Sequence, residues 1–216
     1  MSSRAEATTH GPEPARVIRV EDLAPTPWPN GGGWTREIHR QPSAQRRGQT
    51  AWRLSLATID TVGPFSVLPE VRRWLLLASE GSLHLSIDGT VHRLGHTDTV
   101  EFDGGAAVEV IAVSGTSRVL NLMTYGGVGG HLQAGRLSEN SEVSDRDTAA
   151  IVVLDGHLVV RQASLGRYDT LLLGPQSVDV RSEAATVVRV GVGGTRGDLP
   201  PPTSGRWADG TTDRNT

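Results

Sequence analysis

The 216-residue chain contains no cysteine and no lysine, so all 21 of its basic residues are arginine. Without cysteine the protein has no disulfides, thiolate metal sites, iron–sulfur clusters or cysteine nucleophiles. Without lysine it has no Schiff base and no lysine general base. A lysine-free, arginine-rich composition is also what mutational bias in a GC-rich genome produces, so the arginines need further evidence before they indicate function.

Long apolar runs and runs of like charge are also missing. No apolar stretch approaches the ~20 residues that span a bilayer, and residues 1–15 lack the apolar segment of a signal peptide. The formal net charge is −3, so the chain lacks the excess of positive charge that is typical of nucleic-acid binders. These features predict a cytoplasmic protein that binds neither nucleic acid nor membrane.

The dominant hydrophobic period is two rather than 3.6. Leu83, Leu85 and Ile87 alternate with polar residues, and Asp88-Gly89 then supplies a hairpin turn. Glycines and prolines punctuate many such short runs, and residues 68–73 are the best candidate for a single helical turn. The pattern predicts an all-β protein built as an antiparallel sandwich or barrel.

The second half of the chain repeats the pattern of the first. A strand, a turn with glycine, a second strand and a Gly-Pro or Asp-Gly corner occur in residues 74–102 and again in 150–192. We therefore expect two β-barrel modules, a larger one over residues 16–125 and a smaller, partial one over 149–197. Residues 126–148 would connect them, and residues 1–15 and 198–216 would be disordered tails.

The first candidate site is the segment 28–38, where three consecutive glycines allow close approach to the backbone. It is either a ligand loop or a surface turn closed by glycine and followed by an edge strand. Its candidate ligand-binding residues are Trp28, Asn30, Gly32, Gly33, Thr35, Arg36 and Glu37.

Arginines on two predicted strands form the second candidate site. Arg53 and Ser55 share one face of their strand, and an arginine fork can bind a carboxylate through two parallel hydrogen bonds. The alternative for Arg53 is a structural salt bridge to Glu37. Arg73 shares a face with Leu75 and is either a second cation for the same ligand or a strand-end charge that reaches solvent.

Two further strands contribute candidates. Asn121 and Met123 alternate with leucines, so they face the interior, where an amide must be satisfied by backbone or ligand. Phe65 follows a Gly-Pro turn and either fills the core or lines the site. Because the arginines would keep Glu37 ionised, this carboxylate is expected to orient groups rather than abstract protons.

Motifs for metals and for common catalytic groups are absent from the sequence. There is no His-x-His pair, and His92 and His96 do not share a helical face, so the three or four converging ligands of a metal site are not expected. Neither a Gly-x-Ser-x-Gly elbow nor a phosphate-binding Walker loop occurs. We therefore predict no metal, no cofactor and no catalytic residues of these classes.

The ordered blocks 27–38, 52–66 and 119–124 resemble the HutD/Ves family of cupin-fold proteins, and the resemblance covers about residues 16–195. The family is associated with bacterial histidine utilisation. The resemblance implies an all-β, cupin-like (RmlC-like jelly roll) double barrel or sandwich, a bicupin with a smaller second module. Pro29 stands where the family usually has lysine, and Arg118 where it often has an acid.

The resemblance implies a non-catalytic binder of a small carboxylate metabolite. Such a protein would restrain histidine utilisation by binding an intermediate such as urocanate or formylglutamate. Arg53 and Arg73 would pair with the carboxylate, and Asn30, Ser55 and Asn121 would orient the ligand. Two alternatives stay open: a metal-free enzyme acting on a similar acid, and a protein-interaction module with structural arginines. A homodimer is a further open option.

Overall fold

The computed structural model describes residues 14–137, 139–143, 148–174 and 177–193. Within these ranges the chain forms β-strands and one 3-10 helix, η1 (Val20–Asp22), so the all-β prediction is confirmed. The helical turn predicted at residues 68–73 is wrong. Pro69 and Glu70 form a turn in which Glu70 has a φ of 64°, and Val71 begins a strand.

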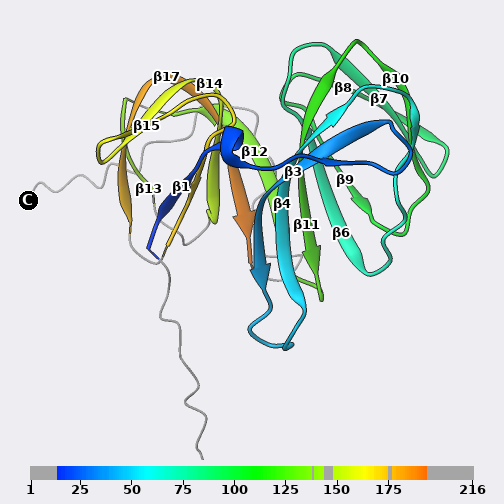
Figure 1. Cartoon of the computed structure of the whole chain (residues 1–216), viewed down its shortest axis with the longest axis horizontal. Helices are drawn as coiled ribbons and strands as arrows, with labels where there is room; N and C mark the ends of the chain where they lie inside the picture. Colours follow the sequence, from blue (N-terminus) through cyan, green and yellow to red (C-terminus); the bar gives the residue numbers. More distant parts are fainter. Residues whose placement is uncertain (1–13, 138, 144–147, 175–176, 194–216) are drawn as a thin grey trace, which may run out of the picture.

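The strands of the described residues form three sheets, and the central one has six strands (Figure 1). In spatial order these are β2 (Thr26–Pro27), β3 (Gly33–Pro42), β4 (Thr50–Ile59), β11 (Ser117–Tyr125), β6 (Val71–Leu77) and β9 (Thr99–Asp103). The four-stranded sheet consists of β5 (Gly63–Pro64), β10 (Val108–Val113), β7 (Ser82–Ile87) and β8 (Thr90–Gly95). We call these two sheets together the sandwich.

The third sheet has seven strands in the described residues and lies on the other side of the central sheet. Its main path is β1 (Arg16–Ile18), β16 (Thr170–Leu172), β14 (Ala150–Val160), β17 (Val178–Val192) and β12 (Gly130–Arg136). Off this path, β13 (Asn140–Val143) pairs with β17, and β15 (Ala163–Leu165) pairs with β14. We call it the curled sheet.

The central sheet is buried on both faces. Leu54 and Leu56 of β4 pack toward the curled sheet, whereas Ala57 and Ile59 belong to the core between the two sheets of the sandwich. Burial on both faces explains why β6 contains a continuous apolar run over residues 74–77, since each side of the strand needs apolar side chains. On β4, side chains alternate between the two faces of the sheet, as the sequence predicts.

The curled sheet encloses its own apolar cluster. Register shifts interrupt the pairing of β14 with β17 between residues 153 and 157, and such bulges bend strands. Ile151 and Val187 on one side of these shifts share a cluster with Val160 and Val180 on the other. The two halves of the long strands therefore pack against each other.

The first described strand, β1, belongs to the curled sheet, and the chain then crosses to the central sheet. Val17 of β1 pairs with Leu171 of β16 in the curled sheet, and the next strand, β2, joins the central sheet. The sequence predicts one module over residues 16–125 and a connection over 126–148, whereas the latter range contains β12 and β13. Of the predicted tails, residues 1–13 and 198–216 lie outside the described residues.

Candidate functional site

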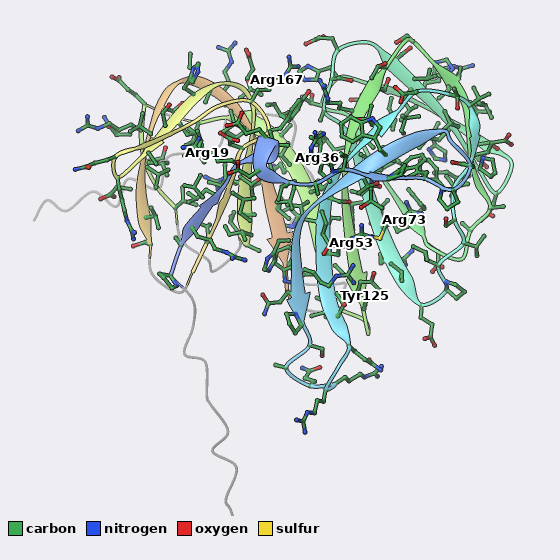
Figure 2. All side chains as sticks on the ribbon, in the orientation of Figure 1. Arg19, Arg36, Arg53, Arg73, Tyr125 and Arg167 are labelled. Atoms are coloured by element: carbon green, nitrogen blue, oxygen red, sulfur yellow. The ribbon has the colours of Figure 1, made fainter. Side chains whose placement is uncertain are left out.

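Inward-facing polar side chains gather at one end of the sandwich interior. In the strand register Met123 lies opposite both Arg53 and Arg73, so the two arginines flank it from the neighbouring strands. Two residues earlier on β11, Asn121 lies opposite Ser55. Because strands lie ~4.8 Å apart, the two arginine backbones are about 10 Å apart. We call Glu37, Arg53, Arg73, Asn121 and Met123 the arginine site; Figure 2 labels its two arginines.

Arg53 is paired with a carboxylate of the protein itself. Its Nε lies 2.7 Å from Glu37 Oε2, and the same oxygen lies 2.7 Å from a terminal nitrogen of Arg40. The hydrogen bond from Arg40, helped by the charge of Arg53, holds the pKa of Glu37 below its usual range although burial opposes this. The predicted ionised state of Glu37 and the predicted salt bridge are both present, so Glu37 is a poor proton acceptor at neutral pH.

Arg73 has a different environment. It is only 6% exposed, and the described residues place no carboxylate within salt-bridge distance of it. Burial, followed by the charge of Arg53, lowers the pKa of Arg73 to about 10, so the guanidinium stays charged at neutral pH. It donates a 3.4 Å hydrogen bond to the carbonyl of Ser66. A buried charge is costly unless it is paired.

Aromatic rings flank this guanidinium. The centre of the Arg73 guanidinium lies 5.2 Å from the ring centroid of Phe65 and 5.0 Å from that of Phe102. Cation–π contacts of this kind offset part of the lost hydration. They supply no hydrogen-bond acceptor to the guanidinium edge.

Three buried polar atoms of the site have no hydrogen-bond partner among the described residues: Arg53 Nε, Arg73 Nε and Asn121 Oδ1. Arg53 Nε has an ion pair with Glu37, which leaves Arg73 Nε and Asn121 Oδ1 without any partner in the described part of the chain. Buried polar groups normally have partners, so each exception calls for an explanation. One atom is a donor and the other an acceptor, and both side chains face the same interior from adjacent strands. A ligand that carries a carboxylate and an N–H group would satisfy both.

The loop before β3 adjoins the site through aromatic contacts. Trp28 Nε1 donates a 2.8 Å hydrogen bond to Thr35 Oγ1, and the Trp28 ring meets the edge of Phe65 at a centroid distance of 5.9 Å. Phe65 in turn contacts Arg73. Trp28, Thr35 and Phe65 therefore form one wall beside the arginine site.

The glycines of this loop have structural partners. The N–H of Gly31 bonds to the carbonyl of Trp28, and the N–H of Gly32 bonds to Asn30 Oδ1. A Cβ on Gly33 would lie 2.0 Å from the carbonyl oxygen of Thr58, so only glycine permits this strand approach. These contacts support the interpretation of the loop as a turn that leads into a strand.

Arg36 does not join the arginine site. Its Nε donates to the carbonyl of Leu23 at 2.9 Å, and its guanidinium stacks 4.3 Å from the ring centroid of Trp34. Figure 2 shows Arg36 nearer the crossing N-terminal segment than Arg53 and Arg73. Its neighbours on β3 alternate faces with it, which is why Glu37 reaches the site and Arg36 does not.

Three neighbours of the site were missed from the sequence. Phe102 could have been found, since it alternates with Glu101 on β9 as an inward residue. Tyr125 shares the face of Met123 by the same period of two, and it favours the charged form of Arg73. Arg40 could not have been found, because a bulge between residues 37 and 39 resets the register.

The described residues contain no group of three histidine, aspartate or glutamate side chains that could hold a metal ion. At the arginine site itself, two cations and an amide do not form a set of metal ligands. In the same part of the chain, no helix has both the length and the apolar character to cross a bilayer.

Comparison with protein families matches residues 20–189 to the HutD model. This chain belongs to the HutD family. It is 33% identical over 109 residues to an uncharacterized 21.2 kDa protein in the hutC 3′ region of Pseudomonas putida, a match that covers 50% of this chain and 57% of that protein. It is 37% identical over 99 residues to protein Ves of Escherichia fergusonii, covering 45% and 51%. The chain thus spans about half the length of the curated relatives it matches, and the predicted HutD/Ves resemblance is confirmed.

Solved structures show the same fold. A conserved protein of unknown function from Pseudomonas aeruginosa PAO1 has 23% identity and a TM-score of 0.71, covering 84% of this chain and 100% of that one. HutD from Pseudomonas fluorescens SBW25, in a formate condition, has 24% identity and a TM-score of 0.68, covering 83% and 100%. The all-β, cupin-like jelly-roll fold is therefore confirmed, and the bicupin description stays a prediction.

Proposed function

We propose that this HutD-family protein binds a small carboxylate metabolite at the arginine site. One observation carries the proposal: Arg73 is a buried, charged guanidinium with no carboxylate partner among the described residues. Arg53 differs because it has an ion pair with Glu37, a carboxylate that it shares with Arg40. Arg73 is therefore the residue that pairs with the ligand carboxylate, whereas Arg53 positions the carboxylate of Glu37 through their ion pair.

The second group of the ligand follows from Asn121. Its buried Oδ1 accepts no hydrogen bond from the described residues, so a ligand N–H is the complementary group. Urocanate carries an imidazole N–H and formylglutamate an amide N–H, each on the same molecule as a carboxylate. Both satisfy Arg73 and Asn121 together, and the Trp28–Phe65 wall offers an apolar surface to the rest of the molecule.

The family supplies the biological setting of the proposal. The Pseudomonas putida relative is encoded in the hutC 3′ region, and the family carries the HutD name. We infer that ligand binding restrains histidine utilisation in the cytoplasm, with a metabolite rather than nucleic acid or membrane as the partner. An intermediate that accumulates would then report the state of the pathway.

Calorimetric titration with urocanate and with formylglutamate tests the proposal. Arg73→Met removes the charge but keeps an apolar chain of similar reach, and loss of a charge-assisted hydrogen bond weakens binding by about 10–100-fold. The matched control is Arg72→Gln, one residue earlier on β6. Its side chain pairs with Glu101 at 3.4 Å on the opposite face, so binding should not change. No heat with either ligand at millimolar concentration, or unchanged affinity in Arg73→Met, rejects the proposal.

The ion pair of Arg53 favours a structural role for that residue. We expect Arg53→Ala to lower stability, and its effect on ligand affinity to be smaller than that of Arg73→Met. The enzyme alternative would require turnover of a candidate acid that disappears in both Arg53→Ala and Glu37→Gln. Because the pKa of Glu37 is lowered, that carboxylate is poorly suited to act as a base.

A further inference from the structure

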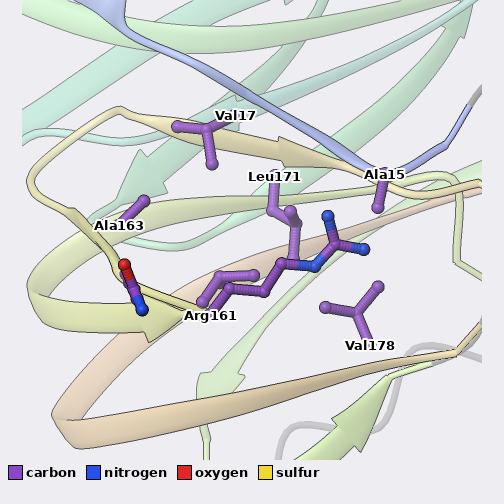
Figure 3. A pocket seen from close by; sticks show the side chains of 8 residues that line it. Ala15, Val17, Arg161, Ala163, Leu171 and Val178 are labelled. Atoms are coloured by element: carbon purple, nitrogen blue, oxygen red, sulfur yellow. The ribbon is translucent and has the colours of Figure 1, made fainter.

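A cavity lies in the curled sheet (Figure 3), and none of its lining residues belongs to the arginine site. Its volume is about 460 Å³, within the range of ~300–1,000 Å³ typical of small-molecule sites. Apolar side chains from the N-terminal segment and from four strands form its wall: Ala15, Val17, Val160, Ala163, Leu171 and Val178.

One cation stands at the rim of this cavity. Arg161 is exposed, lies in the two-residue turn between β14 and β15, and has no ion-pair or hydrogen-bond partner among the described residues. In Figure 3 its guanidinium lies between Ala15 and Val178, with the stem of the side chain along the apolar wall. The cavity therefore combines an apolar interior with a single positive charge at the rim.

The backbone at Arg161 is unusual for an arginine. Its φ is 57°, in the left-handed region that a hairpin turn normally fills with glycine or asparagine. Glu70 has a similar φ in its own turn, so the conformation by itself does not indicate a function. The positive charge of Arg161 and its position over the cavity supply the chemistry of the hypothesis.

We propose that this cavity binds a medium-chain alkyl carboxylate, with the chain against the valine and leucine wall and the carboxylate on Arg161. The polar residues of the lining, Arg161 and Gln162, both lie in the exposed turn, so the rest of the wall offers no polar side chain to an imidazole or an amide. Burial of the chain supplies most of the affinity. The guanidinium fork fixes the carboxylate end.

This inference does not depend on the proposed function. The arginine site has two arginines, an amide and aromatic neighbours inside the sandwich, whereas the curled-sheet cavity has one arginine on a turn. The two sites share no residue. Each can therefore be blocked without changing the other.

The test is calorimetric titration of the full chain with butanoate, hexanoate, octanoate and decanoate. Each added pair of methylenes should strengthen binding by about tenfold until the cavity is filled. Octanol, which has the chain without the charge, should bind at least tenfold more weakly than octanoate. Affinity that does not change with chain length overturns the proposal.

Three variants locate the binding. Ala163→Leu fills the cavity and should abolish octanoate binding, while Arg161→Asn should weaken it about tenfold. Because asparagine tolerates a positive φ, Arg161→Asn should also leave the melting temperature equal to or above that of the wild type. The matched control is Arg47→Asn, an exposed arginine in the β3–β4 loop, which should bind octanoate like the wild type.

The variants also separate the two sites. Octanoate binding that survives Ala163→Leu but disappears in Arg73→Met overturns this inference and leaves the proposed function intact. Octanoate binding that disappears in Ala163→Leu and persists in Arg73→Met supports it. A melting curve of each variant confirms that the loss of binding is not a loss of folding.

Discussion

The arginine site and the curled-sheet cavity place their positive charge in different parts of a β-structure. Arg73 occupies an inward-facing position of a strand, where side chains of neighbouring strands surround it. Arg161 occupies a turn, where its side chain is exposed and lines the curled-sheet cavity. The buried charge of Arg73 therefore needs a partner of opposite charge, whereas the exposed charge of Arg161 can orient a ligand without requiring one.

The two sites are also expected to bind their ligands through different interactions. At the arginine site the gain comes from satisfying buried polar atoms, and a ligand that lacks either the acid or the N–H group should lose most of its affinity. In the curled sheet the gain grows with the apolar surface of the ligand. Four substitutions test this contrast and the contacts that join the two regions.

The largest effect is expected at the apolar layer between the central and the curled sheets. Leu122 is fully buried in this layer, and Leu122→Ala should destabilise the protein by about 3–5 kcal/mol because it leaves a cavity. The melting temperature should fall by roughly 10 °C. Since the layer joins both regions, a thermal melt followed by circular dichroism should show one transition. Two transitions, of which only one shifts, would contradict the shared layer.

A smaller loss is expected at Asp169, which ties the crossing segment to the curled sheet. Its carboxylate lies 2.7 Å from an Arg19 nitrogen and accepts hydrogen bonds from the N–H groups of Val20 at 3.1 Å and Gly166 at 3.0 Å. Asp169→Ala leaves these donors without a partner, which should cost about 3 kcal/mol. Urea denaturation measures the change. A loss below about 1 kcal/mol would mean that water replaces the carboxylate.

Arg73→Met should stabilise the ligand-free protein while it removes ligand binding. The substitution replaces a buried charge that has no carboxylate partner with an apolar chain, a change worth about 2 kcal/mol. The melting temperature should rise by roughly 4–8 °C. The opposite change, a clear loss of stability, would show that Phe65, Phe102 and the Ser66 carbonyl already stabilise the guanidinium sufficiently.

The smallest effect concerns the ion pairs of Glu37. Its side chain is 38% exposed, so solvent screening limits the stabilisation to below about 1 kcal/mol. Because its folded-state pKa is lowered, this contribution is present above the ordinary carboxyl pKa of ~4.3 and is lost as the pH falls through the lowered value. Urea denaturation of wild type and Glu37→Gln at pH 7 and near pH 3 should show a difference that shrinks on acidification. A constant difference would assign the effect to packing.

The sequence predicts much of the sandwich because alternation decides which side chains face inward. Arg53 and Ser55 on β4, and Asn121 and Met123 on β11, follow directly from the leucines that alternate with them. The same reasoning places Arg73 on the inward face of β6. Sequence alone leaves open whether such an arginine is neutralised, since that depends on which acids the neighbouring strands bring close.

Other features depend on irregular backbone or on distant segments. Arg40 reaches Glu37 because of a bulge, and no local pattern marks a bulge in this stretch. The curled-sheet cavity needs side chains from the N-terminal segment and from β14 to β17, which meet only after the sheet bends. The predicted helical turn failed because Pro69 and Glu70 form a tight turn in place of a helix.

The position of β1 determines how the protein can be divided. Its three residues, Arg16–Ile18, pair with β16, which follows them in the chain by about 150 residues. A fragment that stops after β11 would carry this strand without its neighbour, and one that begins at β12 would leave Leu171 and the edge of β16 uncovered. Neither half is a self-contained unit, so one cut cannot separate the two proposed binding sites, and side-chain substitutions have to do so.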